Sequence, residues 1–564
     1  MCCVAKVYSS IMNKRLQNYI EKNDLLVEEQ NGFRVSRSCI DHVLVLCTLL
    51  RNRKALGLDT FVTFVDFQKA FDSVNRQLLL YKLLKIGIRG NFYHSLCAMY
   101  SNPRSRVVLC SHKTEFFDCP IGVKQGDSIS ATLFAIYIND LAEEIRRSGL
   151  GVELDEDLAV SILMYADDIV LMATNEDDMQ EMICIVENWC IRWRLEVNLM
   201  KTNVMHIRGL RKTRSRFIFL FNKRRVDYCE SYRYLGVTLN EFLNFNLTAS
   251  TQAESAGRAL GSIITKTIKN GGLPYRIFTM LYEACCTSVS DYGSEIWGFE
   301  PKDSTLKIHL RAARTYLGLP RNTTSVGVLS EINWMEPVYR TQLRMVRQYI
   351  RLLKMHPNRL PRRILEWDKN ISEEHSFQTW YKEVKSIFLA HNLSSRFDHL
   401  LSKTDIDNMK QSMWVKQTAE LKQRCTEMPK LRLYNAINDF GVTPIYLMLP
   451  LSFVQKMFLA KLRLSALAIR IETGRFERPR LEEKERLCLS CKDGISVESE
   501  SHFMFSCKSY EELRLKWKNE LSVGVNFDDM LPVDKLRVIF KTKENIKITA
   551  QYLISCFDAR SKKV

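Results

Sequence analysis

The stretch that most constrains this chain is Leu163–Leu171, in which two adjacent acidic residues separate two short apolar runs. The runs Val160–Met164 and Ile169–Ala173 are each typical of a buried strand, and the polar residues between them are typical of a tight hairpin turn. Paired carboxylates at Asp167 and Asp168 are costly beside apolar strands unless a cation neutralises them. Mg²⁺ coordinates carboxylate oxygens and keeps positions open for phosphate. The alternative is an ordinary Asp-Asp surface turn.

The composition favours a folded protein with a polyanionic partner. The 564 residues suffice for several domains, and 46% hydrophobic with 26% charged residues is ordinary for a folded chain. The chain has 82 Lys and Arg residues and 64 Asp and Glu residues, which give a net charge of +18. This charge favours nucleic acid as a partner, although a basic enzyme without such a partner could carry the same charge. The 17 cysteines lack framework spacing. With no recognisable signal peptide or membrane span, this pattern predicts a cytoplasmic and nuclear protein.

A third carboxylate, Asp66, ends a β-rich alternating segment at residues 61–66. It precedes the next predicted helix by several residues, which favours a metal ligand over a helix cap, whereas Asp72 lies closer to that helix and is expected to be structural. If the strands are neighbours, Asp66, Asp167 and Asp168 converge. Such a cluster could hold two Mg²⁺ ions about 4 Å apart, the arrangement for in-line phosphoryl transfer to a primer 3′-hydroxyl.

Other residues near these carboxylates have two interpretations each. The Gly-containing loop Pro120–Asp127 opens a helix, where exposed amides suit a phosphate or a nucleotide, although most such loops are only turns. Phe71 could lie beneath the sugar and reject a 2′-hydroxyl by bulk, or be an ordinary core aromatic. Lys201 could protonate the leaving pyrophosphate, or be a surface lysine.

Two basic segments could contact nucleic acid. The loop Glu28–Arg37 contains Arg34 and could bind phosphate, although taken alone it is better interpreted as a solvated loop. Eight cations lie among residues 208–225 with three interleaved phenylalanines, a pattern that suits a nucleic-acid backbone and a solvated hairpin equally well.

The C-terminal part contains a compact set of soft metal ligands. Residues 250–470 are mostly helical in pattern, and residues 541–564 end in a basic tail that we expect to be solvated. Between them, a CxxC pair is followed by a histidine and a further cysteine at a spacing that can close a tetrahedral zinc site, with chance clustering as the alternative. This closed set would make the metal structural. Its members are Cys488, Cys491, His502 and Cys507.

At this point the chain resembles a known family. Six segments stand in the order of reverse transcriptase motifs and are similar to those of non-LTR (LINE-type) retrotransposon polymerases. They are Asn31–Arg34, Phe64–Asp72, Gln125–Ser130, Tyr165–Asp168, Asn198–Thr202 and Tyr234–Gly236. The later segments Tyr292–Trp297 and Arg486–Cys507 also resemble such elements.

The resemblance implies an α+β right-hand polymerase, with a palm built on an antiparallel sheet, helical fingers and thumb, and a mostly helical C-terminal region with a small zinc knuckle. It implies an RNA-directed DNA polymerase that acts on an RNA template, a DNA primer or target, and dNTPs. The implied catalytic residues are Asp66, Asp167 and Asp168 as ligands of two Mg²⁺ ions, and Lys201 as the motif lysine. The implied nucleotide- or template-binding residues are Phe71 as the sugar gate, Gln125, Gly126, Tyr165 and Arg34. The implied Zn²⁺ ligands are Cys488, Cys491, His502 and Cys507.

The expected domains follow the chain in order. Residues 1–240 would form the fingers and palm, 241–330 a thumb-like helical region, 331–470 a helical linker, 471–520 the zinc-knuckle region and 521–564 a basic tail.

Two departures from the family pattern stand out. The loop after Gln125 lacks the usual proline, which predicts a looser loop. No endonuclease signature is present, so we expect an N-terminally truncated copy or partial gene that could not nick its own target.

Two other function classes stay open. One is a catalytically inactive remnant that binds RNA through its basic surface and knuckle. The other is an RNA-templated RNA polymerase, which a bulky Phe71 disfavours.

Overall fold

The computed structural model describes residues 3–101, 103–110, 112–155, 158–299, 302–393, 395, 397–491 and 494–561. It divides the chain into two units, each formed from segments that are separated in sequence. The first comprises Met1–Thr248, Gln348–Ala390 and Ser394–Leu400, and the second comprises Ala249–Arg347, His391–Leu393 and Leu401–Val564. None of the helices among the described residues is both long and apolar enough to cross a bilayer.

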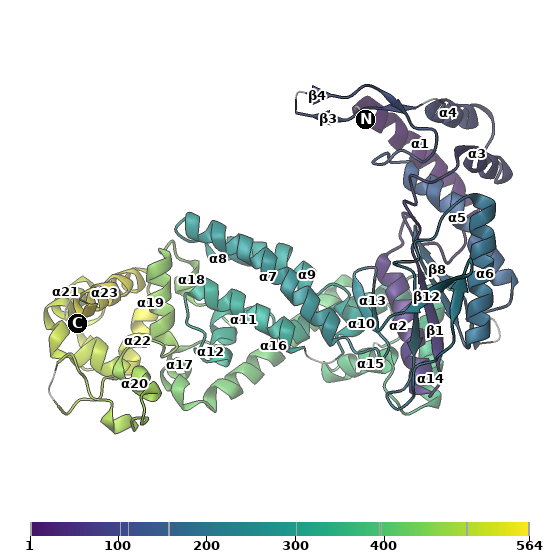
Figure 1. Ribbon diagram of the computed structural model, residues 1–564. Coiled ribbons are helices and arrows are strands. Elements are labelled where there is room, and N and C mark those ends of the chain that lie inside the picture. Colours follow the sequence, from purple (N-terminus) through teal and green to yellow (C-terminus); the bar gives the residue numbers. More distant parts are fainter. Residues whose placement is uncertain are drawn as a thin grey trace. The chain divides into compact units, whose positions relative to one another are not determined.

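A six-stranded sheet in the order β11-β12-β10-β1-β9-β8 forms the palm of the first unit (Figure 1). Its strands are β1 (Thr60–Val65), β8 (Ile162–Tyr165), β9 (Asp168–Ala173), β10 (Asn203–Ile207), β11 (Phe219–Phe221) and β12 (Arg224–Tyr228). The central strand β1 is buried along its whole length and runs antiparallel to both β9 and β10. The sheet is antiparallel as predicted, except that β10 and β12 pair in parallel.

Helices of the first unit bury apolar faces against this sheet and against one another. In α6 (Glu176–Trp193), the side chain of Asn175 accepts a hydrogen bond from the Asp178 amide at 2.8 Å, and three acidic residues occupy the first turn, as suits a helix N-terminus. The other helices are α1 (Cys3–Lys22), α2 (Cys39–Ala55), α3 (Arg76–Lys85), α4 (Gly90–Tyr100), α5 (Ser130–Arg147), α14 (Leu360–Glu374) and α15 (Trp380–Ala390).

Four short hairpins complete this unit. They pair β2 (Arg104–Ser105) with β5 (Phe117–Asp118), β3 (Val108–Leu109) with β4 (His112–Lys113), β6 (Val152–Asp155) with β7 (Leu158–Val160), and β13 (Ser231–Tyr234) with β14 (Val237–Asn240).

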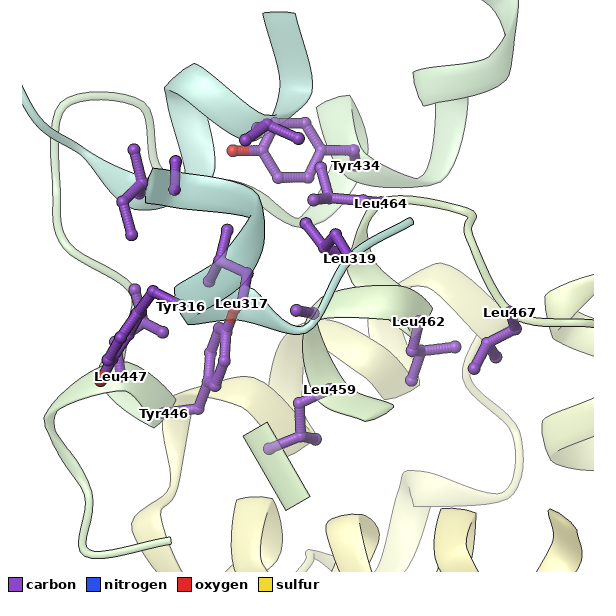
Figure 2. Close-up of a cluster of buried hydrophobic side chains, with 14 of the residues drawn as sticks. Tyr316, Leu317, Leu319, Tyr434, Tyr446, Leu447, Leu459, Leu462, Leu464 and Leu467 are labelled. Carbon is purple, nitrogen blue, oxygen red and sulfur yellow. The ribbon is translucent and has the colours of Figure 1, made fainter. Parts of the chain in front are cut away.

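The described part of the second unit is mostly helical and has its own core. Figure 2 shows part of that core, where Tyr316, Leu317 and Leu319 lie near Tyr434, Tyr446 and a group of leucines from residues 447–467. Its longer helices are α7 (Asn246–Lys269), α8 (Tyr275–Tyr282), α11 (Asp303–Leu317), α12 (Ser325–Ile332), α13 (Pro337–Leu353), α16 (Lys403–Thr426), α19 (Phe453–Arg463), α21 (Glu511–Glu520), α22 (Pro532–Lys541) and α23 (Lys543–Ser561). Shorter ones include α9 (Ser288–Ser290), α10 (Ser294–Trp297), α17 (Arg432–Ile437), α18 (Ile445–Met448) and α20 (Arg470–Thr473).

The predicted α+β class with a mostly helical C-terminal region is confirmed, but two expectations about its organisation are wrong. Residues 348–390, assigned to a linker, pack with the first unit. Residues 521–564, assigned to a basic tail, include α22 and α23. The part expected to be solvated, residues 541–564, contains α23, which buries Ile546, Leu553 and Cys556 completely. The end of that predicted tail, residues 562–564, lies outside the described residues.

Candidate active site and metal centre

Three carboxylates converge at one end of the palm sheet. Asp66 directly follows β1, while Asp167 and Asp168 lie where the β8–β9 hairpin turns. Because Val65 is in register with Ile169 on antiparallel strands, Asp66 and Asp168 are the next opposed residues. Desolvation first, and then the charges of the neighbouring carboxylates, raise the pKa of Asp168 to about 6 and also raise the pKa of Asp167. A cation among these oxygens would offset that repulsion, so the donor set fits a divalent metal.

The loop that precedes α2 holds the turn between these strands in place. Ala166 has a φ of +55°, and its amide donates a hydrogen bond to Gln30 Oε1 at 3.2 Å. The same oxygen accepts from the Gly32 amide at 2.8 Å, and the Asn31 amide donates to the Met164 carbonyl at 2.9 Å. A Cβ on Gly32 would lie 2.3 Å from the Ala166 nitrogen, so only glycine permits this approach. The sequence alone did not predict that Gln30 supports this turn. Its position next to the Asn31–Arg34 motif was the only feature that could have suggested it.

The prediction that Arg34 contacts nucleotide or template is wrong in this structure. Its side chain is only 5% exposed, and its guanidinium forms two 2.8 Å hydrogen bonds with the Glu21 carboxylate. The remaining contacts go to backbone carbonyls of its own loop, including that of Val27 at 2.7 Å. Because the donors of Arg34 are already satisfied within the protein, this residue anchors the loop that supports the turn carrying Asp167 and Asp168.

Lys201 lies on a turn that packs directly against Asp66. Its Nζ is 3.8 Å from Asp66 Oδ2, and its side chain is 66% exposed. The Asp66 carbonyl accepts from the Asn198 amide at 2.7 Å, and the Asp66 amide donates to Thr202 Oγ1 at 3.2 Å. The Asn198–Thr202 segment thus fixes the backbone of Asp66 and presents an exposed ammonium group beside the carboxylates.

Phe71 and the Gln125 loop meet a few residues beyond Asp66. Phe71 is half-buried and stacks on Phe134 with ring centroids 4.8 Å apart, while its carbonyl accepts from the Val123 amide at 2.8 Å. Gln125 is exposed, and its side-chain nitrogen donates to both oxygens of Asp72 at 2.9 Å. Gly126 is exposed with a φ of +76°, a conformation that favours glycine.

Aromatic residues surround the turn that carries Asp167 and Asp168. Tyr165 is half-buried, with ring centroids 6.4 Å from Phe33 and 6.3 Å from His42. Tyr232 on β13 stacks on Phe64 at 4.0 Å. Desolvation, followed by the charges of Asp168 and Asp66, raises the pKa of Tyr232 to about 12. The β13–β14 hairpin therefore lies beside the carboxylates, although sequence reasoning did not single out Tyr232.

The basic segment at residues 208–225 is largely a structured part of the palm. Four of its eight cations are paired with carboxylates, and Phe219 is fully buried in the core of the sheet. The pairs are Arg208 and Arg214 with Glu241, Lys212 with Asp59, and Arg225 with Asp227. Bases could not stack on Phe219, so the interleaved aromatic pattern reflects strand packing.

A second donor cluster lies in the second unit. Cys488, Cys491, His502 and Cys507 bring their ligand atoms within 4.8 Å of one another. Cys488 Sγ is 3.8 Å from Cys507 Sγ, and Cys491 Sγ is 3.5 Å from His502 Nε2. The two outer cysteines are buried, and η6 (His502–Ser506) carries the histidine. Three thiols and one imidazole at this separation could hold a metal ion that prefers sulfur and nitrogen ligands.

Residues 1–239 match the family model described as reverse transcriptase (RNA-dependent DNA polymerase). A probable RNA-directed DNA polymerase from transposon BS of Drosophila melanogaster is 23% identical over 373 residues, which cover 64% of this chain and 40% of that protein. The RNA-directed DNA polymerase from mobile element jockey of the same organism is 24% identical over 380 residues, which cover 64% of this chain and 39% of that protein. A Pol polyprotein from the retrotransposable element R2 of Nasonia vitripennis is 21% identical over a stretch that covers 42% of this chain and 24% of that protein. The chain spans about two fifths of the length of the first two relatives.

Solved telomerase structures show only a slight likeness. Apo telomerase from Candida tropicalis aligns with a TM-score of 0.31 at 12% identity, covering 73% of this chain and 59% of that one. Telomerase from Candida albicans in complex with a fragment of telomeric RNA aligns with a TM-score of 0.28 at 13% identity, covering 73% of this chain and 55% of that one. Likeness at this level establishes neither activity nor partners. Residues 1–239 are therefore similar to the reverse transcriptase family, and about two thirds of the chain is similar to the RNA-directed DNA polymerases of mobile elements.

Proposed function

We propose that this chain is an RNA-directed DNA polymerase that extends a DNA 3′-hydroxyl on an RNA template. The observation that carries the proposal is the convergence of Asp66, Asp167 and Asp168 within the segment that matches the reverse transcriptase family. Its substrates would be dNTPs, and its partners an RNA template and a DNA primer or target.

The three carboxylates would bind two Mg²⁺ ions. When bound, such ions activate an attacking hydroxyl and stabilise the charge of the triphosphate. The protein's own contribution is rigid placement: β1 and β9 fix Asp66 and Asp168 through their register, and Gln30 holds the Ala166 turn before Asp167 and Asp168. Positioning of this kind supplies much of the barrier reduction in phosphoryl transfer.

The neighbouring residues would select and orient the substrates. Lys201 is exposed beside Asp66 and would donate a proton to the leaving pyrophosphate. Phe71 would act as the sugar gate through its bulk, supported from behind by Phe134. Gln125, Gly126 and Tyr165 would position the nucleotide and template.

The Cys/His cluster would bind one Zn²⁺ ion in a structural role. With all four positions filled by protein ligands, no open position would be left for a substrate.

The test is dNTP incorporation on an RNA template with an annealed DNA primer and Mg²⁺, comparing the wild type with Asp167→Asn. Losing one metal-ligating charge should reduce extension by about 10³-fold or more. Asp177→Asn is the matched control, because Asp177 is exposed in the first turn of α6 and should keep wild-type activity. A folded wild type that binds the RNA but does not extend the primer would instead support an inactive RNA-binding remnant.

A further inference from the structure

The loop between α1 and α2, which supports the β8–β9 turn, has little regular structure of its own. The Gln30 amide donates to the Val27 carbonyl at 3.3 Å. The Arg34 amide donates to the Asn31 carbonyl at 3.4 Å. Both distances exceed the usual range of about 2.7 to 3.2 Å. A loop whose backbone is held this weakly depends on side chains for a fixed position.

Two arginines from a later part of the first unit pair with acidic residues at the two ends of this loop. Arg359 Nε donates to Glu28 Oε1 at 2.8 Å. At the other end, Arg351 donates to both oxygens of Asp41 at 2.5 and 2.9 Å. Asp41 is completely buried and Arg359 is only 17% exposed, so solvent screens these charges less than it screens exposed pairs. Both arginines lie outside residues 1–239, the segment that matches the reverse transcriptase family.

A continuous chain of hydrogen bonds leads from Glu28 to the β8–β9 turn. The second carboxylate oxygen of Glu28 forms an ion pair with Arg37 Nη1 at 2.7 Å. The same nitrogen donates to Asn31 Oδ1 at 3.0 Å, and the Asn31 amide donates to the Met164 carbonyl at 2.9 Å. The Met164 amide in turn donates to the Glu29 carbonyl at 2.8 Å. Because Met164 lies in β8 just before the turn, a displacement of Glu28 would reach the turn through bonded neighbours.

We propose that Arg359 is a positioning residue for the polymerase reaction, which holds Glu28 and thereby fixes the turn that carries Asp167 and Asp168. This inference rests on the proposed function. Arg359 Nη2 also lies 3.9 Å from Asp41 Oδ2, so one guanidinium reaches the acidic residues at both ends of the loop. Its planar set of donors suits this double contact better than a single ammonium group does. The segment that matches the reverse transcriptase family therefore does not contain all the residues that set its own catalytic geometry.

Arg359→Ala removes this connection without changing the loop itself. We expect kcat for primer extension to fall about 10-fold, because residues that orient metal ligands commonly affect metal affinity or rate by about 10- to 100-fold. The Mg²⁺ concentration that gives half-maximal extension should rise by a similar factor. Arg359→Lys keeps the positive charge and should recover part of both losses.

Hydrogen exchange of the protein without added Mg²⁺ tests the same connection independently of activity. The amides of Asn31 and Met164 form the hydrogen bonds between the loop and β8. Both amides should exchange about 10-fold faster in Arg359→Ala, because loss of the ion pair lets the loop open more often.

The matched control is Arg362→Ala, on the same helix α14. Arg362 is 20% exposed, close to the value for Arg359, and its ion pair is with Glu366 on that helix. Arg362→Ala should keep the wild-type kcat, Mg²⁺ dependence and exchange rates. The Tm of both variants measures how much each substitution destabilises the fold.

A double-mutant cycle shows whether Arg359 acts through Glu28. Glu28→Gln should cause losses like those of Arg359→Ala, and the combined variant should lose little more than either alone. Additive losses would overturn the inference, because Arg359 would then act by another route.

Two further results would also count against the inference. If Arg359→Ala lowers only the Tm, or speeds exchange without changing kcat and the Mg²⁺ dependence, Arg359 stabilises the fold and does not position the catalytic residues. The proposed function would stand in both cases. A wild type without any extension would overturn the proposed function, and the inference with it.

Discussion

At the residue scale, the turn at Ala166 shows how neighbours impose a conformation that its own side chain disfavours. A φ of +55° costs an alanine about 1 kcal/mol relative to its preferred regions. The hydrogen bond to Gln30 and the backbone pairing of Met164 with Asn31 compensate for that cost. The position of the two carboxylates therefore depends on a loop more than 130 residues earlier, as the Gln30–Ala166 separation of 136 shows.

Gly32→Ala tests this dependence. The new Cβ would lie 2.3 Å from the Ala166 nitrogen, a backbone atom that can only move by displacing the turn that carries Asp167 and Asp168. Because a misplacement of about 1 Å can cost about 10²-fold in rate, we expect primer extension to fall by about that factor. Gly209→Ala is the control, since a Cβ there meets nothing within 4 Å. Unchanged extension by Gly32→Ala would show that the loop need not contact the turn.

Phe71→Val tests the sugar gate. Removing most of the ring leaves space beside Phe134 where a 2′-hydroxyl could fit, so discrimination against ribonucleotides should fall by about 10-fold or more. The measurement is the ratio of kcat/KM for dTTP and UTP on the same RNA template. Phe117→Val, at an exposed phenylalanine of β5, should leave that ratio unchanged. If Phe71→Val also leaves it unchanged, Phe71 is simply a packing residue.

At the element scale, strands and helices with a strong local pattern could be predicted from the sequence. The apolar runs around Asp167 and Asp168 form β8 and β9, and the alternating segment before Asp66 forms β1. These predictions succeeded because residues adjacent in sequence carry the pattern. The side-chain pairings could not be predicted in this way, because Arg34 in the loop before α2 meets Glu21 on α1, and Arg208 meets Glu241 on another segment. Such partners are brought together only by the tertiary fold.

The packing of α14 on α2 supports a prediction about pH. Asp368 is fully buried, accepting from Asn52 Nδ2 at 2.6 Å and from the Tyr381 amide at 2.7 Å. Desolvation, partly opposed by these hydrogen bonds and by nearby cations, raises the pKa of Asp368 to about 6. Because the folded state binds this proton more tightly than the unfolded state, the stability of the first unit should fall as pH rises from about 4 to 6.

Asp368→Asn removes this ionisation, and its side-chain oxygen can still accept a hydrogen bond. We expect it to raise the free energy of unfolding by up to about 3 kcal/mol at pH 7.5 and to have little effect at pH 4. Denaturant unfolding at both pH values measures the difference. Glu373→Gln, at an exposed position of the same helix, should give no pH-dependent gain. An equal effect of Asp368→Asn at both pH values would show that ionisation is not the cause.

At the scale of the whole molecule, helical periodicity predicted buried faces but not the elements that cover them. Residues 348–390 return to the palm-containing unit, where Asp368 on α14 meets Asn52 on α2, 316 residues apart in sequence. The basic composition of residues 541–564 hid the apolar positions of α23, because its basic residues lie toward the two ends, while the buried Leu553 and Cys556 lie between Lys547 and Arg560. Domain boundaries drawn in chain order therefore missed the discontinuous units.

The packing of α23 on the Cys/His cluster gives the last prediction. Arg560 forms an ion pair with both oxygens of Glu498. The Glu498 carboxylate is fully buried and lies 3.6 Å from Cys488 Sγ. The Tyr552 hydroxyl, also on α23, donates to the Met504 carbonyl at 3.2 Å. Arg560→Ala would leave the Glu498 charge buried and unpaired, at a cost of about 3 kcal/mol or more. We expect a lower Tm for the second unit and faster release of bound Zn²⁺ to a chromogenic chelator.

The control for this prediction is Arg432→Ala, which breaks an exposed pair with Glu483 at 3.9 Å and should change neither quantity. If Arg560→Ala lowers the Tm but releases Zn²⁺ at the wild-type rate, α23 stabilises the core without supporting the metal centre. If both change together, the cluster and α23 form one cooperative structure, because a charge left unpaired beside Cys488 loosens a ligand that burial otherwise fixes. In that case the C-terminal helix is part of the metal-binding region, and deletions within residues 543–561 should abolish Zn²⁺ retention.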